Sequence, residues 1–207
     1  MRKSTSINHV LRVVERDPAL AFELFLSANR ELKRAGKPTA TNIRRALLVF
    51  GLARYLEHSK SYETLEQHLA PQFLCPTMNH LGRSYFAARI AERLAKLRGH
   101  VYVEDAFCFG LMCDLDRYVP KLVSATKLTA EPANLRTLLP GLATPLIASN
   151  PLHWCAETAS KFAIETQHAW DPAGFSPIVK TISDLLGIDT YNVESELAQT
   201  AIDTALT

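Results

Sequence analysis

Cysteine, histidine and aspartate side chains are the groups in this sequence that could hold a metal ion. Cys113 and Asp114 are adjacent, and with Cys75 and His80 they form a candidate zinc site. Cys75 and His80 are separated by four residues, which is a loose spacing for such a site. A buried helical cysteine is more often an inert packing residue, so packing is the preferred interpretation of Cys75 and Cys113, and the zinc site is the alternative.

His153 and Cys155 are a second pair of potential ligands, separated by Trp154. Adjacent-but-one positions on a helix point to different sides, so we expect a packing face with Trp154 and Phe162 rather than joint ligation. The sequence contains no phosphate-binding glycine loop, no dinucleotide fingerprint, no nucleophile elbow and no His-Glu-x-x-His motif. These catalytic templates are therefore excluded.

A group of basic residues surrounds a predicted turn between two helices and is a candidate contact for an anion or a nucleic acid. The group consists of Arg30, Lys33, Arg34, Lys37, Arg44 and Arg45. Basic side chains also occur near helix C-termini because they complement the helix dipole. Aromatic residues are not interleaved with this group, so solvated helix ends are the preferred interpretation.

The composition is ordinary for a globular protein, with 47% hydrophobic and 21% charged residues. The 23 basic and 21 acidic residues give a net charge of +2, which provides no global reason to expect nucleic acid or an anionic membrane as partner. The sequence has no apolar run of about 18 residues, and no apolar stretch follows the basic N-terminus, as a secretory signal would require. We therefore expect reduced, mostly buried cysteines and a cytoplasmic protein without membrane contact.

The elements that must position these side chains are predicted to be helical almost throughout, so the predicted fold class is all-α. Asp17-Pro18 is a helix start and Gly36 a helix stop, while Thr41 could cap the next helix. Residues 71–76 resemble a linker, and His100–Val103 is the one short strand candidate. The predicted helices cover residues 17–36, 41–58, 80–97, 104–120, 152–167, 176–187 and 192–206.

The longest predicted helix, residues 80–97, has two kinds of face. One is a bulky stripe formed by Phe86, Ile90, Leu94 and Leu97. The other is a narrow stripe of small side chains, which would let another helix approach closely. The narrow stripe consists of Ser84, Ala87, Ala88, Ala91 and Ala95.

Several segments follow one another in a distinctive order. The opening is Asp17-Pro18-Ala19-Leu20, continuing to Ala28-Asn29, and the helix Ile43–Arg54 follows. The later segments are Asn79-His80-Leu81, Ala87–Ala91 and Glu104–Asp116. Together, these segments resemble the HDOD family, a regulatory offshoot of the HD metal-dependent phosphohydrolases.

The resemblance covers about residues 7–123 and implies an HD-like multi-helix bundle. A single HDOD-like domain would then span residues 1–207, with residues 124–207 as C-terminal helices of looser similarity. HDOD domains usually carry a further helix before the opening motif, whereas only about fifteen residues precede it here. The sequence has no room for a receiver domain, so we expect its input from a separate protein, or from the rest of a longer chain.

The HD phosphohydrolases that this family resembles use a histidine, an adjacent His-Asp pair and a further Asp to hold divalent cations. His80 stands at the first histidine and Asp114 at the Asp of the pair, while Cys113 replaces the paired histidine and Asp116 the usual glycine. Two of four ligands remain, so the resemblance implies a degenerate metal site without catalytic residues or a cofactor. We expect His80 to hydrogen-bond to Asp114 instead; a bound divalent metal is the alternative.

The resemblance implies a non-catalytic signal-transduction module that acts through a regulatory protein partner or a small-molecule or nucleotide ligand, as in bacterial HDOD proteins. One alternative is a divergent HD-type phosphohydrolase acting on a nucleotide or phosphoester. A second is a nucleic-acid-binding regulator that uses the basic group, which the charge balance does not favour. Metal content, hydrolysis and salt-dependent binding distinguish the three.

Overall fold

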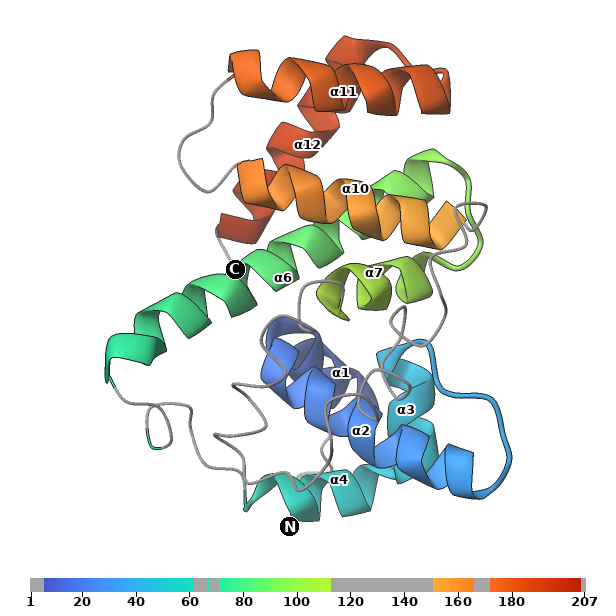
Figure 1. Cartoon of the computed structure of the whole chain (residues 1–207). Helices are drawn as coiled ribbons and strands as arrows, with labels where there is room; N and C mark the ends of the chain where they lie inside the picture. Colours follow the sequence, from blue (N-terminus) through green and yellow to red (C-terminus); the bar gives the residue numbers. More distant parts are fainter. Residues whose placement is uncertain (1–5, 62–66, 68–70, 113–150, 166–171, 206–207) are drawn as a thin grey trace.

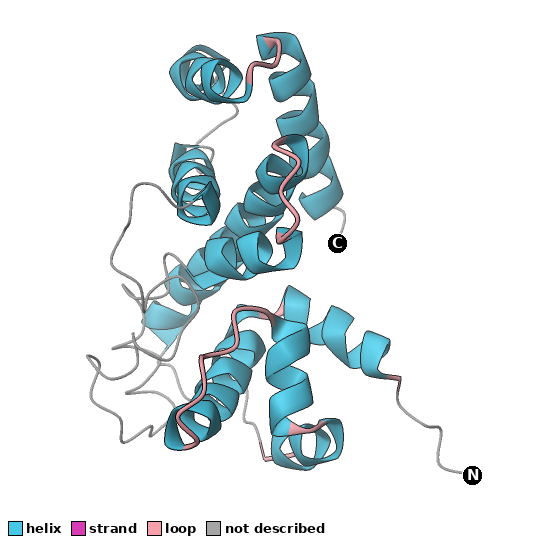
Figure 2. Ribbon diagram, turned by 90° about the vertical axis from the view of Figure 1, so that its right-hand side faces the viewer, coloured by secondary structure: helices cyan, strands magenta, loops and turns pink. Residues whose placement is uncertain are grey.

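The computed structural model describes residues 6–61, 67, 71–112, 151–165 and 172–205, and every regular element within them is an α-helix. Figure 2 shows this part of the chain as helices and loops. The all-α prediction is confirmed for the described residues. The one short strand candidate, His100–Val103, is not a strand, because residues 100–102 form the connection that follows Gly99 (φ 70°) and Val103 already begins the next helix.

The described helices are arranged around a central pair. α6 and α7 lie across the middle of the molecule, with α1 to α4 on one side and α10 to α12 on the other (Figure 1). Their bounds are α1 (Ile7–Arg16), α2 (Pro18–Arg34), α3 (Ile43–Phe50), α4 (Leu52–Ser59), α6 (Pro71–Leu97), α7 (Val103–Met112), α10 (Pro151–Glu165), α11 (Pro172–Leu186) and α12 (Thr190–Ala205).

The start of α2 is the one predicted from Asp17-Pro18. Asp17 Oδ1 accepts hydrogen bonds from the backbone N–H groups of Ala19 (2.9 Å) and Leu20 (3.2 Å). Pro18 occupies the first helical position, where no N–H donor is needed. α1 occupies the segment before this start, where no helix was predicted, and packs against α2 and α3.

The single helix predicted for residues 41–58 is wrong, because Gly51 divides it into α3 and α4. Gly51 has φ 88° and ψ 128°, a conformation that favours glycine and lies outside a helix. The cap of α3 also differs from the prediction. Asn42, not Thr41, accepts the backbone N–H of Arg45 through Oδ1 at 2.9 Å.

The loop between α2 and α3 is fastened to the core by one buried amide. The Asn29 side chain is 0% exposed, and its Oδ1 accepts the backbone N–H of Ala40 at 2.6 Å. Its Nδ2 donates to the Ala40 carbonyl at 3.3 Å. One side chain thus satisfies both backbone groups of a residue that is itself 1% exposed.

The central helix α6 begins at Pro71, so the linker expected at residues 71–76 is wrong. Proline fits the first turn of a helix as well as it fits a linker, and sequence alone did not separate the two. The narrow stripe predicted on this helix is confirmed. A Cβ built on Gly110 of α7 would lie 2.9 Å from Ala87 O, Ala88 Cα and Ala91 Cβ. The two helices approach this closely because both surfaces are small there.

The C-terminal helices were predicted in the right order, but two starts are wrong. α11 begins at Pro172 and contains the Ser176-Pro177 pair that was expected to open it. α12 begins at Thr190 rather than Asn192, and Asp189 Oδ1 accepts the backbone N–H of Tyr191 at 2.9 Å. Gly187 (φ 65°) ends α11 as predicted. The helix expected at residues 152–167 is present as α10.

Buried apolar side chains form two clusters that share the central helices. The first cluster joins α1 to α4 with Leu81 and Ala88 of α6 and four residues of α7. The second joins α10 to α12 with a different part of α6 and with Ala106 and Phe109 of α7. Side chains on two sides of α6 and α7 therefore connect the clusters. Among the described helices, none combines the length and apolarity that crossing a lipid bilayer requires.

Candidate functional site

His80, the first expected metal ligand, is a partly buried residue of α6. Nη2 of Arg83 lies 2.8 Å from Nδ1 of His80, and the Ser84 hydroxyl donates to the His80 carbonyl at 3.1 Å. A guanidinium has only donors, so Nδ1 accepts and carries no proton in this arrangement. The neutral imidazole is therefore the form compatible with this contact.

The other expected ligand positions lie outside the described part of the structure. Cys113, Asp114 and Asp116 fall within residues 113–150, and the side chains of Cys75 and His153 are also not described. The His80–Asp114 contact and the zinc alternative stay predictions. Within the described ranges, no group of three or more His, Cys, Asp and Glu side chains is placed to hold a metal ion.

Two cysteines match the expectation of buried thiols. Cys108 and Cys155 are buried and form no disulfide. Burial raises the pKa of the Cys155 thiol to about 11 and that of Cys108 further still. Both are protonated and unreactive near neutral pH, because the thiolate is the nucleophilic form.

The basic group follows the end of α2 and the start of α3. Burial raises the pKa of the Glu23 carboxyl, and the positive charge of nearby Arg30 acts in the opposite direction. Arg44 Nε lies 3.7 Å from Glu104 Oε1, and Arg45 Nη2 donates to the Pro38 carbonyl at 3.4 Å. The other members of the group are the exposed residues Lys33, Arg34 and Lys37. Part of the group thus makes contacts within the chain.

A small open cleft, which no sequence pattern indicated, lies where α1, α3, α6 and α7 meet. Its volume is about 70 Å³. His80 is not part of it; at 1.5 Å per residue it lies roughly 14 Å along α6 from Arg89, which does line the cleft. The lining residues are Leu11 and Glu15 of α1, Asn42, Ile43 and Arg44 around the start of α3, Arg89 and Glu92 of α6, and Glu104, Phe107 and Cys108 of α7.

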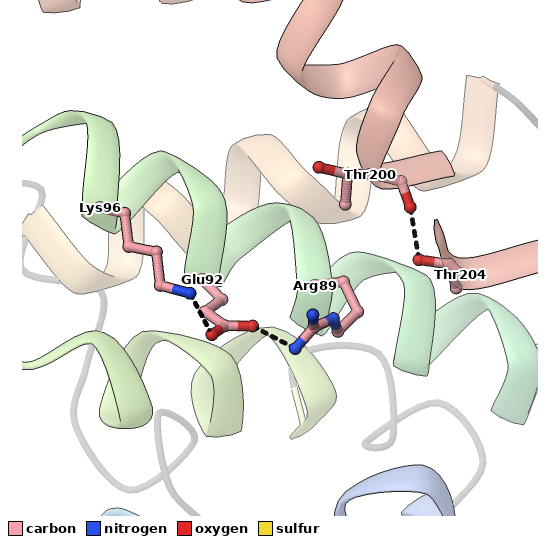
Figure 3. Close-up of polar contacts among 5 residues, drawn as sticks. All are labelled: Arg89, Glu92, Lys96, Thr200 and Thr204. Carbon is pink, nitrogen blue, oxygen red and sulfur yellow. Dashed lines mark hydrogen bonds and ion pairs between the residues drawn. The ribbon is translucent and has the colours of Figure 1, made fainter. Parts of the chain in front are cut away.

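An ion-pair series along α6 forms one wall of the cleft. The two carboxylate oxygens of Glu92 accept from different cations: one lies 2.5 Å from Arg89 Nη1 and the other 2.6 Å from Lys96 Nζ (Figure 3). These side chains are three and four residues apart, so they meet on one face of the helix. Figure 3 also shows Thr200 and Thr204 of α12. Their hydroxyls donate to backbone carbonyls four residues earlier in the same helix.

Acidic residues at the start of α7 contact other lining residues of the cleft. Asp105 accepts from the Thr41 hydroxyl at 3.0 Å and from Asn42 Nδ2 at 2.7 Å. Glu104 faces Arg44. The first turns of α3 and α7 meet here, and carboxylates offset the partial positive charge of both helix N-termini. These contacts fix the start of α3 against α7 beside the cleft.

Glu15 is the electrostatically perturbed group of the cleft. Burial raises the pKa of its carboxyl, and the charges of Glu92 and Glu104 raise it further. Arg89 and Arg44 act in the opposite direction without cancelling the effect. The raised pKa therefore reflects first the burial of Glu15 and then the carboxylates near it.

Only part of this cleft could be predicted from sequence patterns. The spacing of Arg89, Glu92 and Lys96 is a recognisable helical ion-pair pattern. The meeting of Glu15 with Glu104 joins segments about 90 residues apart and has no local signal. In comparisons with known proteins, no family description, no curated protein and no solved structure matched this chain.

Proposed function

We propose that this chain is a non-catalytic regulatory module of the HDOD type, an HD-like helical bundle that acts in the bacterial cytoplasm by binding a protein partner. The observation that carries the proposal is that side chains from the HDOD-like motifs make contacts that hold the bundle together. These contacts lie in α2 and the loop after it, between the start of α3 and α7, and between α7 and α6. No second function has an observation of equal weight.

The opening motif supports this assignment through its two polar residues. Asp17 caps α2, and Asn29 fastens the loop that leads into α3. Both side chains form hydrogen bonds with backbone groups of the same chain. A structural role therefore explains both residues of the motif, as expected for a scaffold protein.

The later motif supports it through α7. Asp105 ties the start of α7 to Thr41 and Asn42, and Gly110 permits the close approach to α6. These two residues come from the segment that would carry metal ligands in an HD enzyme.

The expected metal position argues against hydrolysis in this proposal. In the sequence, His80 and Asp114 remain while Cys113 replaces the histidine of the pair. One imidazole and one carboxylate are a weak site for a divalent cation, whose affinity depends on ligand number and on the groups that orient the ligands. The regulatory function therefore needs no bound cofactor.

The test is metal content together with phosphodiester hydrolysis. We expect the protein, purified without chelator and incubated with Mn²⁺, Mg²⁺ or Zn²⁺, to retain well under one metal ion per chain. It should hydrolyse bis(p-nitrophenyl) phosphate no faster than buffer does. Asp114→Asn should change neither result, and Asp116→Asn is the matched control two residues away.

A stoichiometric metal ion lost in Asp114→Asn but kept in Asp116→Asn, with hydrolysis lost in parallel, would replace the proposal by a phosphohydrolase. Binding of single-stranded or duplex DNA that weakens steeply with salt and depends on Arg34 and Lys37 would instead support the nucleic-acid regulator. A nucleotide that binds without turnover would make the module a small-ligand sensor.

A further inference from the structure

The cleft between α1, α3, α6 and α7 has an excess of negative charge. Its charged groups and their direct partners are four carboxylates, Glu15, Glu92, Glu104 and Asp105, and three basic side chains, Arg44, Arg89 and Lys96. With every group ionised, the balance is one negative charge.

This excess is concentrated at Glu15. Glu92 is paired with Arg89 and Lys96, and Glu104 with Arg44. Asp105 accepts two hydrogen bonds from neutral donors. Within the described part of the chain, no hydrogen bond or direct ion pair reaches the Glu15 carboxylate, although it is partly buried. A partly buried carboxylate without a partner is costly, and a cation would remove that cost.

The remaining lining of the cleft is apolar. Leu11, Ile43 and Phe107 come from three different helices and line the same space as the carboxylates. A lysine side chain combines a hydrocarbon stem with a compact terminal ammonium, so it matches an apolar wall beside an unpaired carboxylate. The volume of about 70 Å³ suits such an unbranched group.

We infer that the cleft receives one lysine side chain of a protein partner, with the ammonium against Glu15 and the stem against Leu11 and Phe107. This inference rests on the proposed function, because it names the chemistry by which the module would recognise its partner. It assigns the contact to α1, α3, α6 and α7 and not to the His80 position.

The first experiment uses n-butylammonium as the probe of the ammonium and its stem. We expect the methyl NMR signals of Leu11 and Ile43 to shift in a saturable manner on titration with n-butylammonium chloride, and not with n-butanol. Glu15→Gln should weaken this binding roughly tenfold, as expected when a charge-assisted contact is lost. Glu57→Gln is the matched control, because Glu57 is an exposed glutamate of α4 that pairs with Lys60 and lies outside the cleft.

The second experiment asks whether the ammonium belongs to a protein. We expect a short uncharged peptide with one central lysine to compete with n-butylammonium, and the same peptide with norleucine at that position not to compete. If butylammonium binds but the lysine peptide does not, the cleft is a small-amine site and the partner contact is wrong. If neither binds, or if Glu15→Gln binds as well as the unmodified chain, the inference fails. Metal content and hydrolysis would still decide the proposed function separately.

Loss of binding in Glu15→Gln is distinguishable from loss of folding. The pKa of Glu15 is raised above its ordinary value of 4.5 in the folded chain by burial, Glu92 of α6 and Glu104 of α7, against Arg89 of α6 and Arg44 of α3. Because the pKa of Glu15 is higher in the folded chain than in the unfolded one, its protonated form adds to the free energy of unfolding below pH 4.5. This contribution is lost as the pH rises through the pKa of Glu15 in the folded chain. Glutamine does not titrate, so the variant should be at least as stable as the unmodified chain at pH 7, measured by urea unfolding.

Discussion

Asn29 shows how a single polar side chain can hold a loop that has no regular structure. The segment between α2 and α3 must turn the chain back, and its residue Ala40 is buried with both backbone groups away from water. Backbone N–H and C=O groups in such a place need partners, and the two ends of one amide supply both. The position of Asn42, the cap of α3, depends on this loop.

Replacing Asn29 by alanine should destabilise the protein by about 2–3 kcal/mol, because the N–H and C=O of Ala40 would lose their partners while staying buried. Urea unfolding followed by circular dichroism measures the change in the free energy of unfolding. Asn8→Ala is the matched control, since Asn8 is an exposed residue of α1, and it should change stability by less than about 0.5 kcal/mol. Equal effects of the two substitutions would show that the buried amide is dispensable.

At the scale of helices, the glycines Gly110 of α7 and Gly82 of α6 have opposite surroundings. Gly110 lies where α7 touches the backbone of α6, so the absence of a Cβ sets the distance between them. Gly82 of α6 has no atom within 4 Å of the Cβ position and is exposed. Glycine is therefore needed for close helix packing at position 110, whereas at position 82 it only lowers the stability of the helix.

Gly110→Ala should therefore lower the free energy of unfolding by about 1–3 kcal/mol, because two of the three atoms that its Cβ would meet at 2.9 Å are backbone atoms that cannot rotate away. Gly82→Ala should instead be neutral or stabilising by up to about 1 kcal/mol, since alanine is the better helix former. Thermal and urea unfolding of both variants provide the comparison. A Gly110→Ala protein as stable as Gly82→Ala would mean that the helices separate at no cost.

At the scale of the molecule, the two buried clusters share α6 and α7 and cannot separate without exposing both. Figure 1 shows these helices between the N-terminal and C-terminal groups. Ala88 of α6 belongs to the first cluster and Ala87, its neighbour, to the second. We therefore expect the described helices to unfold as one cooperative unit.

A substitution in the first cluster should thus be felt in the second. Phe25→Leu should destabilise by on the order of 1 kcal/mol, because Phe25 is fully buried in α2. Trp154 of α10 packs against the second cluster, so its fluorescence reports that cluster once Trp170 is replaced by phenylalanine. The fluorescence and circular dichroism midpoints should move together in urea. A Trp154 transition that stays in place would show that the clusters unfold independently.

Local signals predicted most helices and some of their ends. Asp17-Pro18, Gly36 and Gly187 act through a cap or a positive φ, which need only the neighbouring residues, and each appears where expected. Gly51 and Pro71 were misread because the same residue types also occur within helices and linkers, and neighbouring residues do not distinguish these uses. The all-α class of the described chain was therefore predictable, while several boundaries were not.

The cleft was decided only by tertiary structure. Glu15, Arg44, Arg89 and Glu104 come from four helices far apart in the chain, and the raised pKa of Glu15 arises from burial and from charges that folding brings near it. Sequence periodicity indicates which face of a helix is apolar, but it carries no information on which other helix covers it. By itself, the amino-acid sequence determined a set of helices with a close-packed seam on α6; only the packing of those helices placed an unpaired carboxylate beside an apolar wall.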